Sequence, residues 1–425
     1  MDKRILEQVF SEQKEEITRT MERTLVSRHE ESLVNLDSSL AQVVIGVRRS
    51  GKSILCCNVL KKSGVHFAYM NFDDERLYDL KGSDLNDALQ VLYKIYGDFT
   101  YLFIDEIQNI PEWFLFVNRL LRNGMHILIT GSNAKLLSGE LATHLTGRYS
   151  KIELFPFSFD EYCDLKKIDK DSVTTKAVAF RRAAFDEYLK CGGFPELLLN
   201  PNDIYYIDTL VKNILETDIK KRYKVRYDSV LTKLAWHLMN VAPAAINYAD
   251  LQNLFALKSV HTAENYALYY KNAYLFLGIQ KYSAKSKFRI TNEKFYTVDT
   301  SLMNRRENAF AGENLGWRLE TLILIELLRR TRPQFLDIYY YSDRSGEVDF
   351  VVVSQNRPTQ LYQISYDISN PKTYKREINS LINGAKKLNC DDLYLITDHE
   401  YQDITEKGYL IKIRPAYQWC LEVDR

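Results

Sequence analysis

Residues 46–53 read G-x-x-x-x-G-K-S, and this motif constrains the fold more than any other part of the chain. It directly follows the apolar run 41–45 and precedes the apolar stretch 54–60. That order is typical of a buried strand, a tight glycine turn and the start of a helix. Backbone N–H groups in such a turn, together with the positive end of the helix, form a cradle for phosphate. The motif therefore predicts a loop that binds a nucleoside triphosphate.

The side chains of this loop predict a nucleoside triphosphate and Mg²⁺ as the cofactors. We expect Lys52 to reach the β- and γ-phosphates and Ser53 to place its hydroxyl on Mg²⁺. The residues expected to contact the nucleotide within this motif and just after it are Gly46, Arg48, Arg49, Ser50, Gly51, Lys52, Ser53 and Ile54. The sequence contains no guanine-reading motif, so the choice of ATP over GTP rests on a family resemblance.

The composition is that of an ordinary soluble globular protein. Apolar residues make up 46 % and charged residues 27 % of the 425 residues, and the net charge is +1. At this length we expect several domains, and the balanced charge indicates no global field that attracts nucleic acid or membranes. The six cysteines form no C-x-x-C pair, and no stretch reads as a signal sequence or a membrane span. We therefore expect a cytoplasmic protein without a membrane partner.

A second motif, the Walker B pattern, ends the apolar run 100–104 with Asp105 and Glu106. We expect Asp105 to hold Mg²⁺ together with Ser53, and Glu106 to orient and deprotonate the attacking water. A solvated acidic turn after a strand would contain the same two residues. Because the pair lies downstream of a complete phosphate loop, the two motifs together favour ATP hydrolysis.

Two further polar residues are candidates for a role in hydrolysis. The apolar run 127–130 ends close to Ser132, which we expect to sense the γ-phosphate at the carboxyl edge of the sheet. A simple helix cap is the alternative for Ser132. Arg148 is a candidate arginine finger, acting either within its own chain or on a neighbouring subunit. Its use in trans would require a homo-oligomer.

The alternation of strands and helices predicts an α/β fold that begins with a P-loop NTPase parallel sheet. Strands are expected at 42–45, 65–71, 100–104, 126–130 and 151–154, and helices at 52–62, 83–96, 112–123 and 133–138. Later, three helical segments and a hairpin formed by 276–282 and 287–290 predict a winged helix-turn-helix. The expected domains are an N-terminal helical arm (1–35), a P-loop ATPase core (36–157), a helical lid (158–225), a middle winged helix-turn-helix (226–300) and a C-terminal α/β domain (310–425).

These motifs together resemble a prokaryotic group of AAA-type P-loop ATPases. The resemblance covers about residues 15–220 and rests on the segments 46–53, 104–108, 130–132, 145–148, 154–162 and 192–196. It implies ATP as the nucleotide and an AAA-type core at 36–157. It also implies that the segment 192–196 lies in the lid close to the nucleotide, so that Pro195 contacts it.

Members of this family usually carry a C-terminal domain of unknown function that resembles a restriction-endonuclease core, here residues 310–425. The resemblance implies a metal site built from an acidic residue on a helix, an Asp at a strand start and a Glu-x-Lys on the next strand. Glu320 and Asp349 match the first two positions, but Gln363 and Ser365 stand in the Glu and Lys positions. Gln can still bind a hard cation, whereas Ser cannot replace the ammonium that stabilises the transition state. We therefore expect a degenerate site at these first three residues, and we do not expect nuclease activity.

The predicted function is Mg-dependent ATP binding and hydrolysis that drives a conformational switch, coupled to DNA or to a protein partner. DNA contact would come from Lys258, His261 and Asn265 on the expected recognition helix, although neighbouring tyrosines equally suit a packing surface. Two alternatives stay open. One is a DNA-binding regulator that ATP controls with little turnover, and the other is an ATP-gated nuclease.

Overall fold

The computed structural model describes residues 1–131, 145, 147–223, 225, 228–283, 293–305 and 314–422. It divides into two compact units, Met1–Pro156 and Phe157–Arg425. The boundary lies one residue before the end that the sequence predicts for the ATPase core. Among the described residues, no helix combines the length and the apolar character that crossing a membrane requires.

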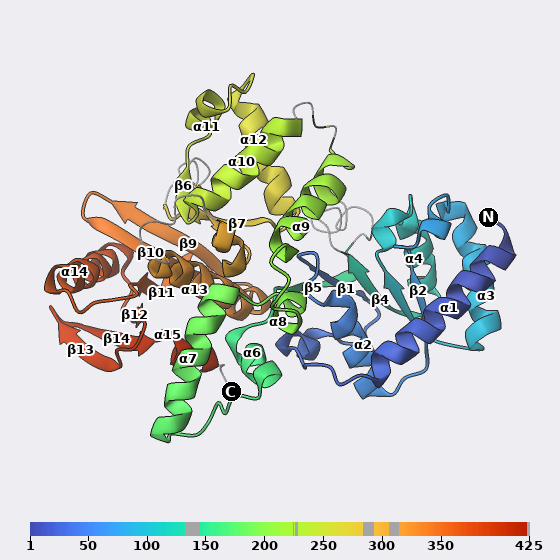
Figure 1. Cartoon of the computed structure of the whole chain (residues 1–425), viewed down its shortest axis with the longest axis horizontal. Coiled ribbons are helices and arrows are strands. Elements are labelled where there is room, and N and C mark those ends of the chain that lie inside the picture. Colours follow the sequence, from blue (N-terminus) through green and yellow to red (C-terminus); the bar gives the residue numbers. More distant parts are fainter. Residues whose placement is uncertain are drawn as a thin grey trace. The chain divides into compact units, whose positions relative to one another are not determined.

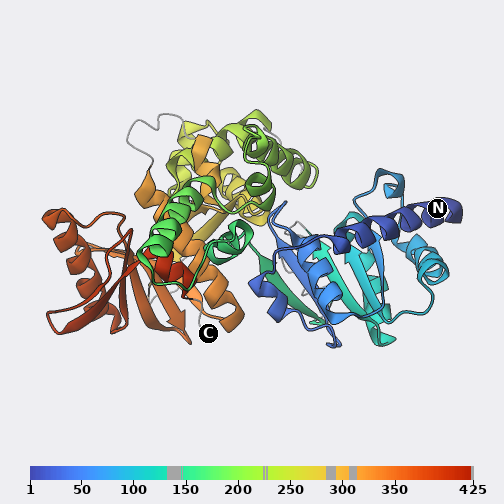
Figure 2. The ribbon, with the colours of Figure 1, turned by 60° about the horizontal axis from the view of Figure 1, so that its bottom comes forward.

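The described part of the first unit contains a five-stranded parallel sheet (Figures 1 and 2). Its strands are β1 (Ala41–Gly46), β2 (Phe67–Asn71), β3 (Tyr101–Asp105), β4 (His126–Gly131) and β5 (Tyr149–Leu154). Their spatial order is β2-β3-β4-β1-β5, so β4 lies between the strand before the phosphate loop and the strand that ends in the Walker B pair. This sheet confirms the predicted α/β class and brings the ends of β1, β4 and β3 to one edge.

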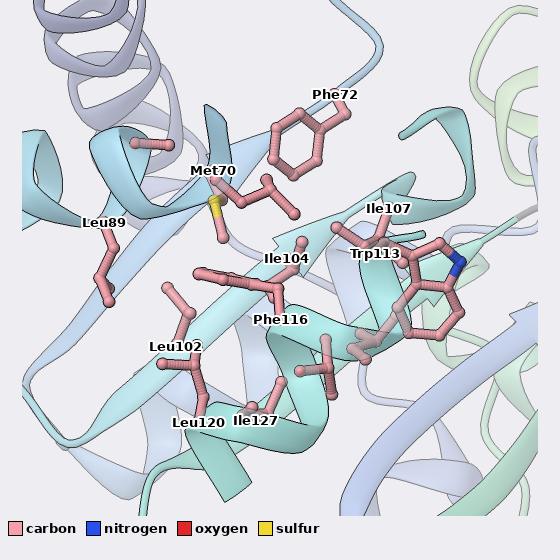
Figure 3. Close-up of a cluster of buried hydrophobic side chains, with 14 of the residues drawn as sticks. Met70, Phe72, Leu89, Leu102, Ile104, Ile107, Trp113, Phe116, Leu120 and Ile127 are labelled. Carbon is pink, nitrogen blue, oxygen red and sulfur yellow. The ribbon is translucent and has the colours of Figure 1, made fainter. Parts of the chain in front are cut away.

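Helices cover both faces of this sheet, because successive side chains of a strand point to opposite faces. The elements are α1 (Lys3–Glu22), α2 (Lys52–Ser63), α3 (Leu85–Tyr96) and α4 (Trp113–Arg122), with short 3-10 turns η1 (His29–Leu33), η2 (Glu75–Leu77), η3 (Gly82–Asp84) and η4 (Ile107–Asn109). On one face, α3 and α4 share an apolar cluster with Leu102 and Ile127 (Figure 3). On the other face, α2 packs with Phe103 and Leu128. A helix expected at 133–138 lies outside the described residues.

The second unit begins with helices where the sequence predicts a lid. These are α6 (Phe159–Lys166), α7 (Thr175–Cys191), α8 (Pro195–Leu199), α9 (Tyr206–Asn213) and a π-helical segment, η6 (Ile214–Lys220). Helix α7 is capped by Gly192, whose φ of +75° favours glycine. Asp299 approaches this end closely, because its Oδ2 accepts a hydrogen bond from the Gly193 N–H at 2.8 Å. The two glycines thus allow the end of α7 to contact a distant part of the same unit.

Three helices and a hairpin follow. They are α10 (Asp228–Val241), β6 (Ala244–Ile246), α11 (Tyr248–Leu254), α12 (Val260–Asn272), β7 (Phe276–Lys281), β8 (Glu293–Thr297) and the turn η8 (Thr300–Arg305). This is the order of elements that a winged helix-turn-helix requires, and the assignment itself stays a prediction. The expected hairpin strand at 287–290 lies outside the described residues, and β7 pairs antiparallel with β8.

The C-terminal elements alternate strands with two long helices. They are α13 (Leu315–Thr331), η9 (Arg332–Gln334), β9 (Asp337–Asp343), β10 (Gly346–Ser354), β11 (Arg357–Ile364), α14 (Pro371–Leu388), β12 (Leu393–Thr397), β13 (Gln402–Glu406), β14 (Tyr409–Pro415) and α15 (Ala416–Leu421). Helix α14 packs on β10, β11 and β12, and shares with them the apolar cluster that contains Val351, Leu361 and Leu395.

One sheet runs through the described part of the second unit. Its nine strands follow the order β13-β14-β12-β11-β10-β9-β7-β8-β6. Gln280 on β7 pairs in parallel with Tyr339 on β9, and this pairing joins the hairpin to the C-terminal strands. The segments 226–300 and 310–425, which the sequence treats as two domains, therefore share a sheet. Local patterns could not predict this, because they do not specify which distant strands pair.

Candidate nucleotide site and a polar pocket in the second unit

The phosphate-loop motif connects the end of β1 to the start of α2. Gly46 and Gly51 have φ values of +146° and +90°, in the region that favours glycine. A Cβ on Gly46 would lie 2.0 Å from the carbonyl oxygen of Leu154 on β5, so only glycine fits at this position. Arg49 also has a positive φ of +69° and is exposed, and Arg48 is half-buried. The loop is therefore a tight turn that begins against the neighbouring strand.

Two buried polar side chains within the loop fit a phosphate ligand. Ser50 is fully buried, and its Oγ has no hydrogen-bond partner among the described residues. Lys52 is 6 % exposed, and its Nζ donates to the carbonyl oxygens of Gly46 at 3.2 Å and Val47 at 3.0 Å. A buried hydroxyl without a partner is costly unless a ligand satisfies it. The loop thus has a donor and a cation suited to phosphate oxygens.

Arg28 ties the phosphate loop to the end of β5. Its guanidinium donates to the carbonyl oxygen of Ser50 at 2.9 Å and to that of Phe155 at 2.7 Å. Arg28 is 5 % exposed, so both bonds lie out of water. Hydrogen bonds from a charged donor are among the stronger ones in proteins. Arg28 therefore links the phosphate loop to the residue that follows β5, a role that the sequence does not suggest.

Asp105 lies at the centre of the expected Mg²⁺ site. It is 4 % exposed, and it accepts hydrogen bonds from the hydroxyl groups of Thr130 at the end of β4 and Tyr69 on β2, the latter at 3.4 Å. Burial, followed by the charge of Glu106, raises the pKa of Asp105 to about 6, while hydrogen bonds from Thr130 and Ser53 act in the opposite direction. Ser53 and Asp105, the two residues expected to hold Mg²⁺, are thus within contact of each other. Two oxygen ligands side by side suit a hard cation.

Glu106, the expected water-activating residue, is half-buried at the end of β3. Its backbone has a φ of +53°, and its N–H donates to the carbonyl oxygen of Thr130 at 3.1 Å. The Gln108 side-chain amide donates to a carboxylate oxygen of Glu106. The carboxylate is therefore oriented by a neighbour two residues along the chain.

Arg148 occupies a position that contradicts its use in cis. It precedes β5, and its carbonyl oxygen accepts a hydrogen bond from the N–H of Ala41 at 3.1 Å, at the start of β1. The phosphate loop follows the opposite end of β1, at Gly46. A strand rises about 3.3 Å per residue, so roughly 16 Å of strand separates the two edges. The arginine finger in trans stays a prediction.

Three candidate residues remain, namely Ser132, Ile54 and Pro195. Ser132 lies outside the described residues. Ile54 is exposed on the first turn of α2, and its 38 % exposure leaves it open to contact with a ligand. Pro195 is the first residue of α8, in the second unit, and its contact with the nucleotide stays a prediction.

A polar pocket of about 690 Å³ lies in the second unit, and it brings together the three residues of the expected degenerate site. Glu320 from α13, Asp349 from β10 and Gln363 from β11 all line it. The register of β10 against β9 shifts between Val348 and Val351, and such irregularities re-aim side chains. Burial, followed by the charge of Glu320, raises the pKa of Asp349 well above its usual range.

Lys294 from β8 joins this acidic group. Its Nζ lies 2.8 Å from Glu320 Oε1 and 2.9 Å from Glu347 Oε1. Burial acts to lower the pKa of Lys294, but the neighbouring carboxylates outweigh burial and raise this pKa above its usual value. A charged lysine from β8 therefore lies beside this site, although the lysine position of the expected Glu-x-Lys pattern is Ser365.

Comparison with protein families gives two matches. Residues 38–163 match the AAA domain family, and residues 182–312 match a domain of unknown function. The chain is also 33 % identical over 405 residues to the uncharacterized protein MJ1544 of Methanocaldococcus jannaschii, covering 91 % of this chain and 90 % of that protein. The chain belongs to the AAA-type P-loop ATPase family. The AAA match spans β1 to β5 and reaches α6, and the second match includes α8 to α12 and the β7–β8 hairpin.

Three further similar proteins do not assign a role to this AAA protein. An uncharacterized protein of Haemophilus influenzae is 30 % identical over 421 residues, covering 95 % of this chain and all of that protein. Among solved structures, the RuvB Holliday junction branch migration motor of Thermotoga maritima has a TM-score of 0.27 at 14 % identity, covering 62 % of this chain and 88 % of that one. Cdc6p of Pyrobaculum aerophilum has a TM-score of 0.29 at 14 % identity, covering 66 % and 93 %. Similarity at this level carries no argument about function.

The prediction from the sequence did not include several residues that complete these two sites. Thr130 ends a strand that the sequence predicts correctly, so its position next to Asp105 could have been inferred from the strand order. Arg28 and Lys294 lie far along the chain from the motifs that they contact, and no local pattern marks them. Glu377, which accepts a hydrogen bond from Gln363 Nε2 at 2.8 Å, likewise comes from a helix without a recognisable motif.

Proposed function

We propose that this AAA protein binds ATP with Mg²⁺ and hydrolyses it, and that hydrolysis drives a conformational switch. One observation carries the proposal. Asp105 is buried at the end of β3 in hydrogen-bonding contact with Ser53 of the phosphate loop, and Glu106 follows directly. Belonging to the AAA-type family supports the same activity.

The residues would divide the work as follows. Lys52 and the loop amides would neutralise the phosphates, and Ser53 and Asp105 would hold Mg²⁺, which when bound screens the charge of the phosphate oxygens. Glu106 would accept a proton from the attacking water while Gln108 holds its carboxylate. Ser132 would sense the γ-phosphate, and Pro195 in the lid would contact the nucleotide.

The test is phosphate release by the full chain with ATP and Mg²⁺. Replacing Glu106→Gln should lower the rate by at least about 100-fold, since general-base catalysis typically contributes 10²–10⁴-fold, and should leave ATP binding unchanged. Glu112→Gln is the matched control, because Glu112 is exposed and has a similar φ of +57°. Equal loss in both variants, or unchanged turnover in Glu106→Gln, would contradict hydrolysis at this site.

DNA is the partner that the second unit supports. The order α10, α11, α12 and hairpin is that of a winged helix-turn-helix, and Lys258 and His261 are exposed near the start of α12. We propose that DNA bound there changes the ATPase rate. Phosphate release measured with and without single- and double-stranded DNA tests this, and a rate that no DNA changes would favour a protein partner.

A second candidate function is a DNA-binding regulator in which ATP acts as a conformational ligand with little turnover. The bond from Gln108 is the observation behind it, because this bond leaves at most one oxygen of the Glu106 carboxylate for a water molecule. Under this alternative, ATP would alter DNA affinity in Glu106→Gln as it does in the unmodified protein, and both proteins would release little phosphate.

A further inference from the structure

The polar pocket of the second unit is lined by carboxylates from different elements, and one lysine beside the pocket forms ion pairs with two of them. Glu320 comes from α13, Glu347 and Asp349 come from β10, and all three line the pocket of about 690 Å³. Lys294 comes from β8, which belongs to the hairpin segment earlier in the chain. The three-dimensional fold, and not a local motif, brings this ammonium to the carboxylates.

The lysine is held firmly in place. Its Nζ bridges Glu320 Oε1 at 2.8 Å and Glu347 Oε1 at 2.9 Å, and the residue is 8 % exposed. Lysine is almost never buried to this degree unless it is paired. The ammonium therefore balances the charge of two half-buried carboxylates.

One oxygen of Glu320 and one oxygen of Asp349 already have donors. Glu320 Oε1 accepts from the Tyr296 hydroxyl at 2.7 Å in addition to Lys294, and Asp349 Oδ2 accepts from the Ile364 N–H at 2.8 Å. A divalent cation on Glu320 Oε1 would have to displace the ammonium or share this oxygen with it, which weakens metal binding. Within the described part of the chain, no group of three or more histidine, cysteine, aspartate or glutamate side chains has the arrangement of a metal site.

The third position of the restriction-endonuclease pattern, Gln363, adds no charge. Gln363 Nε2 donates to Glu377 Oε2 at 2.8 Å, which turns the neutral Oε1 away from that carboxylate. This Oε1 has no hydrogen-bond partner among the described residues, and Gln363 is 6 % exposed. A neutral amide oxygen suits a hydrogen-bond donor and is a weaker ligand for a hard cation than a carboxylate. The donor set therefore fits a divalent metal ion poorly.

We infer that Lys294 is the built-in cation of this pocket, and that it binds Glu320 and Glu347 in the place where a restriction-endonuclease-like site would hold a divalent metal ion. The inference does not rest on ATP hydrolysis by the first unit. It gives the acidic residues of the pocket a counter-charge although position 365 is a serine.

The experiment measures Mn²⁺ binding to the nucleotide-free full chain by electron paramagnetic resonance of free Mn²⁺. An Asp105→Asn background removes the expected metal ligand of the first unit. Adding Lys294→Met should create a site for one Mn²⁺ per chain, because the carboxylates lose their cation. This protein should bind Mn²⁺ at least tenfold more tightly than the Asp105→Asn protein does. A further Asp349→Asn substitution should remove that site again.

Lys271→Met is the matched control, since it removes an ion pair with Glu293 at 2.7 Å outside the pocket and should create no Mn²⁺ site. The inference is overturned if the Asp105→Asn protein already binds Mn²⁺ in a way that Asp349→Asn abolishes, or if Lys294→Met keeps its circular dichroism spectrum and gains no site. It is also overturned if the unmodified protein cleaves plasmid DNA with Mn²⁺ and Asp349→Asn does not. If Lys294→Met fails to fold, the comparison with and without Asp349→Asn decides alone: a loss of Mn²⁺ binding overturns the inference, and no difference supports it.

Discussion

At the scale of single residues, Asp105 shows how the strand order builds a site. Strand β4 lies between β1 and β3, so the hydroxyl of Thr130 reaches the carboxylate at the end of β3. This contact fixes one carboxylate oxygen and leaves the other to the hydroxyl of Tyr69. The position of the carboxylate therefore depends on a hydroxyl that belongs to neither sequence motif.

Replacing Thr130→Val should reduce phosphate release on the order of tenfold or more, since a hydrogen bond to a charged group contributes about 1.5–3 kcal/mol. ATP binding without Mg²⁺ should change little, because the phosphate loop is untouched. Turnover at saturating ATP checks the first point and equilibrium binding the second. Thr100→Val, an exposed position at the other end of β3, is the control and should behave like the unmodified protein. Normal turnover in Thr130→Val would show that Asp105 does not need this donor.

The sequence predicts the residues of the phosphate loop well, because they are contiguous and their spacing is fixed by the turn that they form. It predicts poorly the residues that support the loop from a distance. Arg28 lies 22 positions before Ser50, and Lys294 lies 53 positions before Glu347. Charged side chains at such separations look like ordinary surface residues until the fold brings them together.

At the scale of elements, the end of α7 depends on the absence of side chains at two positions. A Cβ on Gly192 would lie 1.9 Å from Asp299 Oδ1 and 2.9 Å from the backbone nitrogen of Ser301. A Cβ on Gly193 would lie 2.2 Å from the carbonyl oxygen of Phe157. The glycine pair therefore has a structural reason in the packing of the second unit, whether or not it also lies near nucleotide.

Gly192→Ala should lower the free energy of unfolding by roughly 1–3 kcal/mol more than Gly408→Ala, because overpacking adds to the cost of a positive φ. Gly408 is a suitable control, since its φ is +84° and no atom lies within 4 Å of the added Cβ. Urea unfolding followed by circular dichroism measures both variants. Equal destabilisation of the two would mean that Asp299 simply moves aside.

Long, periodic elements were predicted close to their observed bounds, and short ones were missed. The helix expected at 52–62 is α2, and the strand expected at 126–130 is β4. Strand β6 spans three residues and α15 spans six, which is too short for a periodic pattern to emerge. Strand β13 is largely exposed, so its residues do not form an apolar run.

At the scale of the whole molecule, the position of Arg148 bears on assembly. It lies at the amino edge of the sheet, whereas the phosphate loop lies at the carboxyl edge of the same sheet. If Arg148 acts as an arginine finger, it must act on the site of another chain. Catalysis would then require an oligomer.

Arg148→Ala alone should lower phosphate release by more than about 100-fold if it is such a finger. Mixing it with Glu106→Gln should restore activity above the sum of the two separate proteins, because one chain supplies the arginine and the other the carboxylate. A mixture of Glu106→Gln and Lys52→Ala is the control, since neither chain then has a complete site. No recovery in the first mixture would exclude a finger in trans at this position.

The parallel pairing of β7 with β9 has a consequence for how this protein can be divided. Without the C-terminal strands, the end of β7 at Gln280 and Lys281 would present unpaired backbone N–H and C=O groups on one side. Open strand edges of this kind recruit other chains and aggregate. We therefore expect a fragment that ends before α13 to aggregate. The hairpin segment has to be produced together with the strand β9 that pairs with it.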